Sequence, residues 1–205
     1  MEKKKLEGFF KKALGYMEKE HPEELKWARE INENTFKNLK SKTFLSEYCW
    51  VVFAAGFKVS TVEEKFEDLK AAYKGFDLDS LSRMRSIKPV LAVINHEQKA
   101  NAFLNGAKAI HEEGFSKFKK RLKKEGMTAL QSLPYIKDIT QKHLAKNIGL
   151  ADVAKDDVWL ERIKDKYSAS SVEELVDYLS AKFKQSKHVV DVVLWRYSAD
   201  KKKVE

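Results

Sequence analysis

The feature that most limits how this chain can fold is the spacing of its apolar residues, which recur every three to four positions along almost its whole length. No segment alternates apolar and polar residues beside a hairpin turn, as a surface strand would. The 205 residues include only 8 Gly and 3 Pro, so long irregular stretches are not expected. Because 43% of the residues are hydrophobic, the sequence predicts an all-α fold with a sizeable core.

Helix boundaries follow from this periodicity and from residues typical of helix starts and stops. Connections between the predicted helices are short, so residues 1–205 are expected to form a single compact unit. The predicted helices cover residues 2–19, 23–40, 43–55, 62–73, 97–113, 115–124, 128–132, 139–147, 157–166, 172–184 and 187–198.

Cysteine content and hydropathy indicate the compartment. The single cysteine, Cys49, excludes a disulfide framework and any multi-cysteine metal site held within one chain. No apolar run of signal-peptide or membrane-spanning length is present. We therefore expect a cytoplasmic protein in a reducing environment, with no membrane partner.

Net charge is the first indication of a partner. The chain carries a formal charge of +9, and its lysines cluster at four places. A polyanion such as nucleic acid would complement these clusters, and a solvated surface with many ion pairs would also account for them, since 31 acidic residues are interspersed. The clusters lie at residues 3–5, 117–124, 182–187 and 201–203.

The stretch LPYIKDIT, which begins at Leu133, lies between two short predicted helices. It resembles the helix-hairpin-helix element of the DNA glycosylase superfamily, which includes endonuclease III and the 3-methyladenine DNA glycosylases. That element reads Leu-Pro-Gly-hydrophobic-Gly-X-X-Thr-Ala. Tyr135 and Lys137 replace its two glycines, and an ordinary helix-turn-helix corner would also fit the pattern. The matching residues are Leu133, Pro134, Ile136 and Thr140.

The resemblance implies a phosphate grip, in which backbone N–H groups and the amino end of the second helix face a DNA phosphate. Around residues 133–147 it gives four candidate DNA contacts. Two more come from the Ala-Gly turn at residues 54–58, where the family inserts residues into the base stack. The candidate DNA contacts are Tyr135, Lys137, Asp138, Thr140, Phe57 and Lys58.

A catalytic aspartate is implied by the same resemblance. The family places one at the start of the helix after the hairpin, in the pattern Asp-X-X-X-X-Arg-hydrophobic, which Asp157, Arg162 and Ile163 match. Asp157 is therefore the catalytic candidate, and its neighbour Asp156 is the alternative. Either aspartate could instead serve only as a helix cap, a position that Asp favours in any protein.

A second region extends the resemblance over residues 44–167. Its steps are Ala54-Ala55-Gly56-Phe57-Lys58, Gly75-Phe76-Asp77 and Lys99-Ala100, and the first two are similar to those of the 3-methyladenine branch. The family fold implies two lobes with a cleft between them: residues 41–155 would form a central helical lobe with the hairpin at 133–147, and residues 1–40 with 156–205 would form the second lobe.

Flipping a base out of a duplex requires a wedge and an aromatic or apolar pocket. Phe57 is the wedge candidate, and Trp50, Trp159 and Trp195 are candidates for the base pocket. For each of these residues a place in the hydrophobic core is the competing interpretation.

The function that the resemblance implies is excision of a damaged base, with alkylated purines favoured, by hydrolysis of the N-glycosidic bond. Ile139 stands at or beside the place where bifunctional members carry a lysine, so a monofunctional enzyme is expected, although Lys137 and Lys142 flank that place. The expected partner of this monomer is duplex DNA with a damaged base, without cofactor or metal. The alternatives are a noncatalytic DNA-binding protein, a bifunctional enzyme acting on oxidised bases, and a helical interaction scaffold.

Overall fold

The computed structural model describes residues 1–204, and every regular element within that range is a helix. The all-α prediction is confirmed for this part of the chain. None of the described helices is both long and apolar enough to cross a membrane.

The elements are thirteen α-helices and two 3-10 segments, within residues 1–204. In chain order they are α1 (Lys3–Glu20), α2 (Pro22–Glu30), α3 (Glu33–Lys37), α4 (Ser41–Ala54), α5 (Val59–Ala72), η1 (Lys74–Phe76), α6 (Leu78–Ser82), α7 (Lys88–Val93), α8 (Glu97–Glu113), α9 (Phe115–Glu125), η2 (Gly126–Ser132), α10 (Asp138–Asn147), α11 (Val158–Lys166), α12 (Val172–Phe183) and α13 (Lys187–Lys201).

Two compact units follow from the contacts between helices. The central unit is Phe36–Leu150, and the terminal unit combines Met1–Thr35 with the segment from Ala151 onward. The chain enters and leaves the central unit once each, so the terminal unit is assembled from two segments that are far apart in the sequence.

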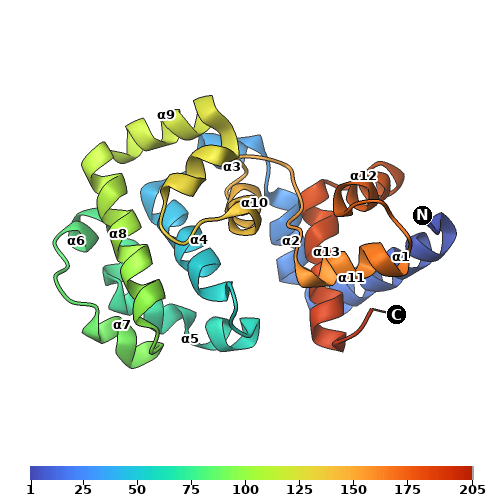
Figure 1. The fold of residues 1–205 in the computed structure, drawn as a ribbon, viewed down its shortest axis with the longest axis horizontal. Coiled ribbons are helices and arrows are strands. Elements are labelled where there is room, and N and C mark those ends of the chain that lie inside the picture. The colour runs from blue at the N-terminus through green and yellow to red at the C-terminus, as the bar shows by residue number, and fades with distance from the viewer. Residues whose placement is uncertain (205) are drawn as a thin grey trace. The chain divides into compact units, whose positions relative to one another are not determined.

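The terminal unit is organised around α13, which contacts α1, α2, α11 and α12 (Figure 1). Apolar residues occupy nearly all sides of α13, as expected for a helix enclosed by others. Fully buried side chains of α1, among them Leu6, Phe10 and Met17, belong to the same core as α13. Helix α13 therefore holds together the two segments of this unit.

Aromatic side chains fill the core of the central unit, where α4 packs against α8. Tyr48, Phe103 and Tyr73 are fully buried, and the ring centroids of Tyr73 and Phe103 lie 4.4 Å apart. A Cβ added to Gly106 of α8 would lie 2.4 Å from the hydroxyl oxygen of Tyr48. Only glycine lets α8 approach Tyr48 this closely.

One predicted helix is wrong in its extent. The span 23–40 is divided into α2 and α3, with Ile31 extended between them. Asn32 accounts for the break, because its side-chain oxygen accepts a hydrogen bond from the backbone N–H of Asn34 at 2.8 Å. An asparagine that bonds the backbone in this way favours a helix start over a helix interior.

Short elements between α5 and α8 are absent from the sequence prediction. They are η1, α6 and α7, each of six residues or fewer, too short to display a helical period. The predicted helix at 128–132 is a 3-10 segment, η2, that begins at Gly126.

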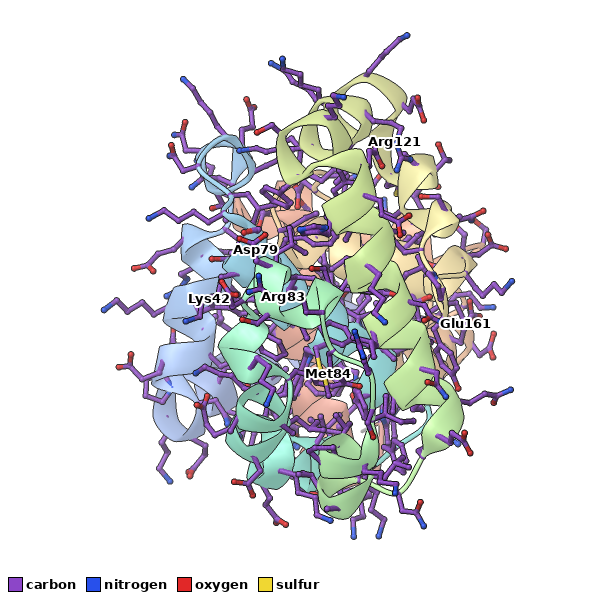
Figure 2. The ribbon with its side chains drawn as sticks, turned by 90° about the vertical axis from the view of Figure 1, so that its left-hand side faces the viewer. Lys42, Asp79, Arg83, Met84, Arg121 and Glu161 are labelled. Atoms are coloured by element: carbon purple, nitrogen blue, oxygen red, sulfur yellow. The ribbon has the colours of Figure 1, made fainter. Side chains whose placement is uncertain are left out.

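The lysine cluster at 117–124 on α9 contains residues with structural roles. Arg121 donates hydrogen bonds to both carboxylate oxygens of Glu113, at 2.9 and 2.8 Å, and to Ser132 at 3.3 Å. Lys119 donates to the carbonyl oxygen of Lys37 at 2.8 Å. Figure 2 shows Arg121 among many charged side chains that project from this face of the molecule. These two cations stabilise packing around α9 and leave the other basic residues of the cluster to solvent.

Candidate functional site

The turn at residues 133–137 joins η2 to α10, and its backbone carries one strained position. Tyr135 has φ +70°, in the left-handed region that favours glycine and costs a non-glycine residue roughly 1 kcal/mol. The helix-hairpin-helix pattern that this stretch resembles has glycine at this place, and Tyr135 adopts a backbone conformation that glycine favours. Leu133 and Ile136 are buried on either side and hold the turn in place.

Two hydroxyl groups fix the ends of this turn. The Tyr48 hydroxyl donates to the carbonyl oxygen of Pro134 at 2.7 Å. At the other end, the Thr140 hydroxyl oxygen accepts a hydrogen bond from the backbone N–H of Lys137 at 2.7 Å. The turn is therefore attached both to the core of the central unit and to the first turn of α10.

The amino end of α10 is the predicted phosphate contact. Its first backbone N–H groups have no acceptor within the helix, as at any helix start, and the side chain of Lys137 is exposed beside them. The Asp138 carboxylate adds a negative charge at the same end and accepts a hydrogen bond from Gln131 at 2.7 Å. Lys137 is therefore an exposed positive group beside the first N–H groups of α10.

Lys99 joins this turn to the Ala-Gly turn. Its side chain is 2% exposed, and its ammonium donates to the carbonyl oxygens of Val52 and Ala55, both at 2.5 Å. The same nitrogen lies 5.3 Å from the ring centroid of Phe57 and 4.5 Å from that of Tyr135. The buried ammonium of Lys99 thus caps the carboxyl end of α4. It also lies against the rings of Phe57 and Tyr135, two of the predicted DNA contacts.

A pH dependence follows from Lys99, because burial lowers its pKa to about 8. In an unfolded chain lysine titrates near pKa 10.4, so between about pH 8 and pH 10.4 the unfolded state binds more protons. The free energy of unfolding should then rise with pH in this window by at most about 1.4 kcal/mol per pH unit.

The measurement is urea unfolding of wild type and Lys99→Met at several pH values across this window. The variant lacks the titrating group, so the difference between the two free energies of unfolding isolates Lys99 from the other lysines and tyrosines. We expect the free energy of unfolding of wild type to increase relative to that of Lys99→Met as pH rises. A difference that stays constant from neutral pH to about pH 10.4 would contradict the lowered pKa.

Phe57 has a second neighbour besides Lys99, and Lys58 and Trp50 are the remaining candidates of the central unit. Phe57 is half-buried, with its ring edge-on to His96 at 5.6 Å, and Lys58 is exposed just before α5. Trp50 is half-buried on α4, where it packs edge-on against Phe66 at 5.4 Å. The packing of Trp50 is that of a partly exposed core residue.

Asp157 is the N-cap of α11 in the terminal unit. One of its carboxylate oxygens accepts hydrogen bonds from the backbone N–H groups of Trp159 and Leu160, at 2.9 and 3.1 Å. The other oxygen lies 3.2 Å from the ammonium of Lys155. Asp156 is also half-buried but is not the cap, so the two aspartates are distinguished by position.

The loop before α11 is attached to α13 at two points. The Asp152 carboxylate accepts hydrogen bonds from the N–H groups of Lys187 and His188 at the start of α13, at 3.2 and 2.9 Å. Further along, the backbone N–H of Lys155 donates to the buried Asp191 carboxylate at 2.9 Å. These bonds fix the position of Asp157 relative to the core of the terminal unit.

Lys155 brings Asp157 and Trp195 together. Its ammonium lies 4.4 Å from the ring centroid of Trp195, in addition to its ion pair with Asp157. Trp195 also has the guanidinium of Arg196 at 4.8 Å, whereas Trp159 is stacked with Arg162 at 4.9 Å. Two of the predicted site residues in this unit, Asp157 and Trp195, thus both contact Lys155. The third, Trp159, contacts Arg162 instead.

Two lysines of these clusters were missed by the sequence analysis. Lys99 was noted only as part of a Lys-Ala step, and Lys155 was not singled out. The one feature of the sequence that points to Lys155 is its position two residues before Asp157. Over residues 1–204, no group of three or more His, Cys, Asp or Glu side chains is placed to hold a metal ion.

Comparisons with protein-family models, with curated proteins and with solved structures return no match.

Proposed function

We propose that this chain is a DNA glycosylase that flips a damaged base, with alkylated purines favoured, out of duplex DNA and hydrolyses its N-glycosidic bond. The observation that carries the proposal is the Asp157 carboxylate, which two backbone amides and Lys155 hold at the start of α11. The supporting features are the 133–137 turn, its exposed Lys137 and the net charge of +9.

The chemistry suits a fixed carboxylate. Cleavage of an N-glycosidic bond passes through a state in which the sugar carries positive charge, and a preorganised negative group stabilises that state without reorganisation. The side chain of Asp157 is only 17% exposed, so little water screens it. In this mechanism Asp157 stabilises the sugar cation and orients the water that attacks it, while the base departs.

Lys155 has a positioning role in the proposal. Its ammonium lies 3.2 Å from the carboxylate oxygen of Asp157 that does not cap the helix, and this ion pair keeps that oxygen in a defined direction. When a sugar cation develops nearby, Asp157 exchanges part of this ion pair for the new charge. The rival function, a noncatalytic DNA-binding protein, is favoured by the fact that both carboxylate oxygens already have partners.

The experiment that separates these functions is base release by the purified protein. Duplexes carrying one alkylated, oxidised or deaminated base are incubated with it, and free base is measured alongside strand cleavage. Release of an alkylated purine without strand cleavage is the expected result. Binding without release from any duplex would support the noncatalytic alternative. A covalent adduct trapped by borohydride, and lost on replacement of Lys137, Lys142 or Lys155, would show a bifunctional enzyme.

The proposed phosphate grip makes a separate prediction about salt. The logarithm of the binding constant for undamaged duplex should fall linearly with the logarithm of salt concentration, with a slope of about −0.9 for each phosphate neutralised. Lys137→Glu should weaken binding equally on all sequences and reduce that slope by about one. Titrations monitored by fluorescence anisotropy at several salt concentrations give both quantities.

Lys26→Glu is the matched control, because Lys26 is exposed on α2 and the substitution changes net charge by the same amount. It should leave the salt slope close to that of wild type. A slope near zero for wild type, or equal effects of the two substitutions, would contradict a specific grip at the 133–137 turn.

A further inference from the structure

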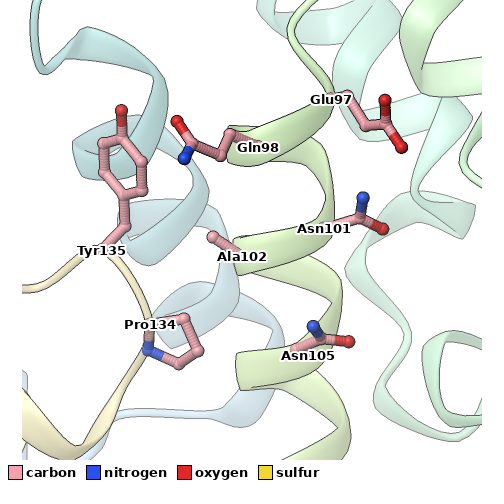
Figure 3. A pocket seen from close by; sticks show the side chains of 7 residues that line it. All are labelled: Glu97, Gln98, Asn101, Ala102, Asn105, Pro134 and Tyr135. Atoms are coloured by element: carbon pink, nitrogen blue, oxygen red, sulfur yellow. The ribbon is translucent and has the colours of Figure 1, made fainter.

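A groove of about 730 Å³ lies on the central unit between α8 and the 133–137 turn. Its walls are formed by Gln98, Asn101 and Asn105 of α8 on one side and by Pro134 and Tyr135 of the turn on the other. Figure 3 shows Gln98 and Ala102 on the side of α8 that faces Tyr135 and Pro134.

The amides of this groove are available to a ligand. Gln98, Asn101 and Asn105 are spaced by three and four residues, so they follow one face of α8. Within residues 1–204, none of these three side chains forms a hydrogen bond to the protein. Each offers both a donor and an acceptor to whatever enters the groove.

The walls are held in place before any ligand binds. The Tyr48 hydroxyl lies 2.7 Å from the carbonyl oxygen of Pro134 and 3.3 Å from that of Ala102, so one buried side chain connects the two walls. The Tyr135 ring is held by its backbone conformation and by the ammonium of Lys99. A preformed site avoids the entropy cost of ordering its side chains when the ligand binds.

The charge of the lining decides which part of a nucleic acid could enter. No lysine or arginine lines the groove, and its one charged residue, Glu97, is acidic. A phosphate would be repelled there, whereas a neutral, flat group with hydrogen-bonding edges would not. An aromatic ring beside side-chain amides is the combination that binds nucleobases, by stacking and by paired hydrogen bonds.

We propose that this groove binds an unpaired nucleobase of the DNA, preferably adenine, which stacks on Tyr135 and is hydrogen-bonded by Gln98, the amide that points toward Tyr135 in Figure 3. Adenine is preferred because a Gln or Asn amide can donate to its N7 and accept from its N6 amino group at once. The inference rests on the proposed DNA-binding function and adds a base subsite that is separate from Asp157.

The test compares two single-stranded hexanucleotides, one of deoxyadenosine and one in which every base is replaced by an abasic tetrahydrofuran. Both carry the same phosphates, so a difference in their affinity for the full chain reports base binding alone. We expect the deoxyadenosine strand to bind about tenfold more tightly, the scale of one stacked base. Equal affinities would overturn the proposal.

Two variants locate the effect. Tyr135→Asn removes the ring while keeping a residue that tolerates the left-handed conformation, and Gln98→Ala removes one amide from an exposed helical position. Each should reduce the preference for the deoxyadenosine strand several-fold. Gln98→Ala should also leave binding of the abasic strand unchanged, because Gln98 lies outside the proposed phosphate grip. A preference that survives in both variants would place the base elsewhere and overturn the assignment.

An NMR titration separates this inference from the proposed function. Adding 2′-deoxyadenosine to the ¹⁵N-labelled chain should shift the two side-chain amide signals of Gln98, and deoxyribose 5-phosphate should not. If these shifts occur while the protein releases no base from any duplex, the proposed base subsite is supported and the proposed glycosylase activity is wrong. If the protein releases a base but the shifts do not occur, the proposed glycosylase activity is supported and the proposed base subsite is wrong.

Discussion

Asp157→Asn is expected to reduce base excision by about 100-fold or more, the scale of losing one preorganised electrostatic stabiliser. The asparagine oxygen can still accept the hydrogen bonds from the N–H groups of Trp159 and Leu160, since Asn is as good an N-cap as Asp. Only the charge is removed, but the largely buried ammonium of Lys155 then loses its ion-pair partner, so the free energy of unfolding should fall by up to about 3 kcal/mol without loss of the fold. Single-turnover base release from a damaged duplex measures the first quantity, and urea unfolding measures the second.

Asp156→Asn is the matched control, with the same change of charge one residue earlier. It should reduce excision far less, because Asp157 and not Asp156 forms the cap and the pair with Lys155. If Asp157→Asn retains wild-type activity, Asp157 is only a cap and the catalytic assignment is wrong. If Asp156→Asn is the inactive variant, the catalytic carboxylate is the neighbouring one.

Gly106→Ala is expected to destabilise the central unit by roughly 1–3 kcal/mol, the usual cost of adding a carbon to a filled core. The new Cβ would lie 2.4 Å from the hydroxyl oxygen and 2.6 Å from a ring carbon of Tyr48. Tyr48 has no exposed surface to move toward, and its hydroxyl is bonded to the carbonyl of Pro134. Either the ring shifts and loses that bond, or α8 moves away from α4.

Gly8→Ala is the control for this substitution. Gly8 lies on the exposed side of α1, and nothing lies within 4 Å of a Cβ added there. It should stabilise the protein by about 0.5–1 kcal/mol, the difference in helix propensity between alanine and glycine. Thermal and urea unfolding of both variants provide the comparison, and a Gly106→Ala protein as stable as wild type would show that Tyr48 can relax.

Periodicity predicted most of the helices because most of them bury one face over ten or more residues. Helix α8 was predicted with both ends correct, and the structure shows it capped by His96 and Gly114. The helix predictions that were wrong have local causes. The side chain of Asn32 accepts a backbone hydrogen bond and so interrupts the predicted helix at 23–40, and α6 and α7 are too short to show a helical period.

The candidate site was predictable only where the chemistry is local in sequence. The capping role of Asp157 depends on residues two and three positions later, so residue type and place were enough to make Asp156 and Asp157 cap candidates, and the structure shows that Asp157 is the cap. Lys99 bonds carbonyl groups 44 and 47 residues away, and the pairing of the Lys155 amide with Asp191 spans 36 residues. No pattern along the chain encodes such distances, because they depend on how the helices pack.

The division of the terminal unit into two segments has a consequence during synthesis. When the ribosome has released residues up to Leu150, the central unit has all of its sequence, whereas α1 and α2 still lack α11, α12 and α13. The apolar face of α1 must then remain uncovered while the rest is translated, on the order of seconds at typical elongation rates. During this interval α1 and α2 are the segments whose exposed apolar surface a chaperone could bind.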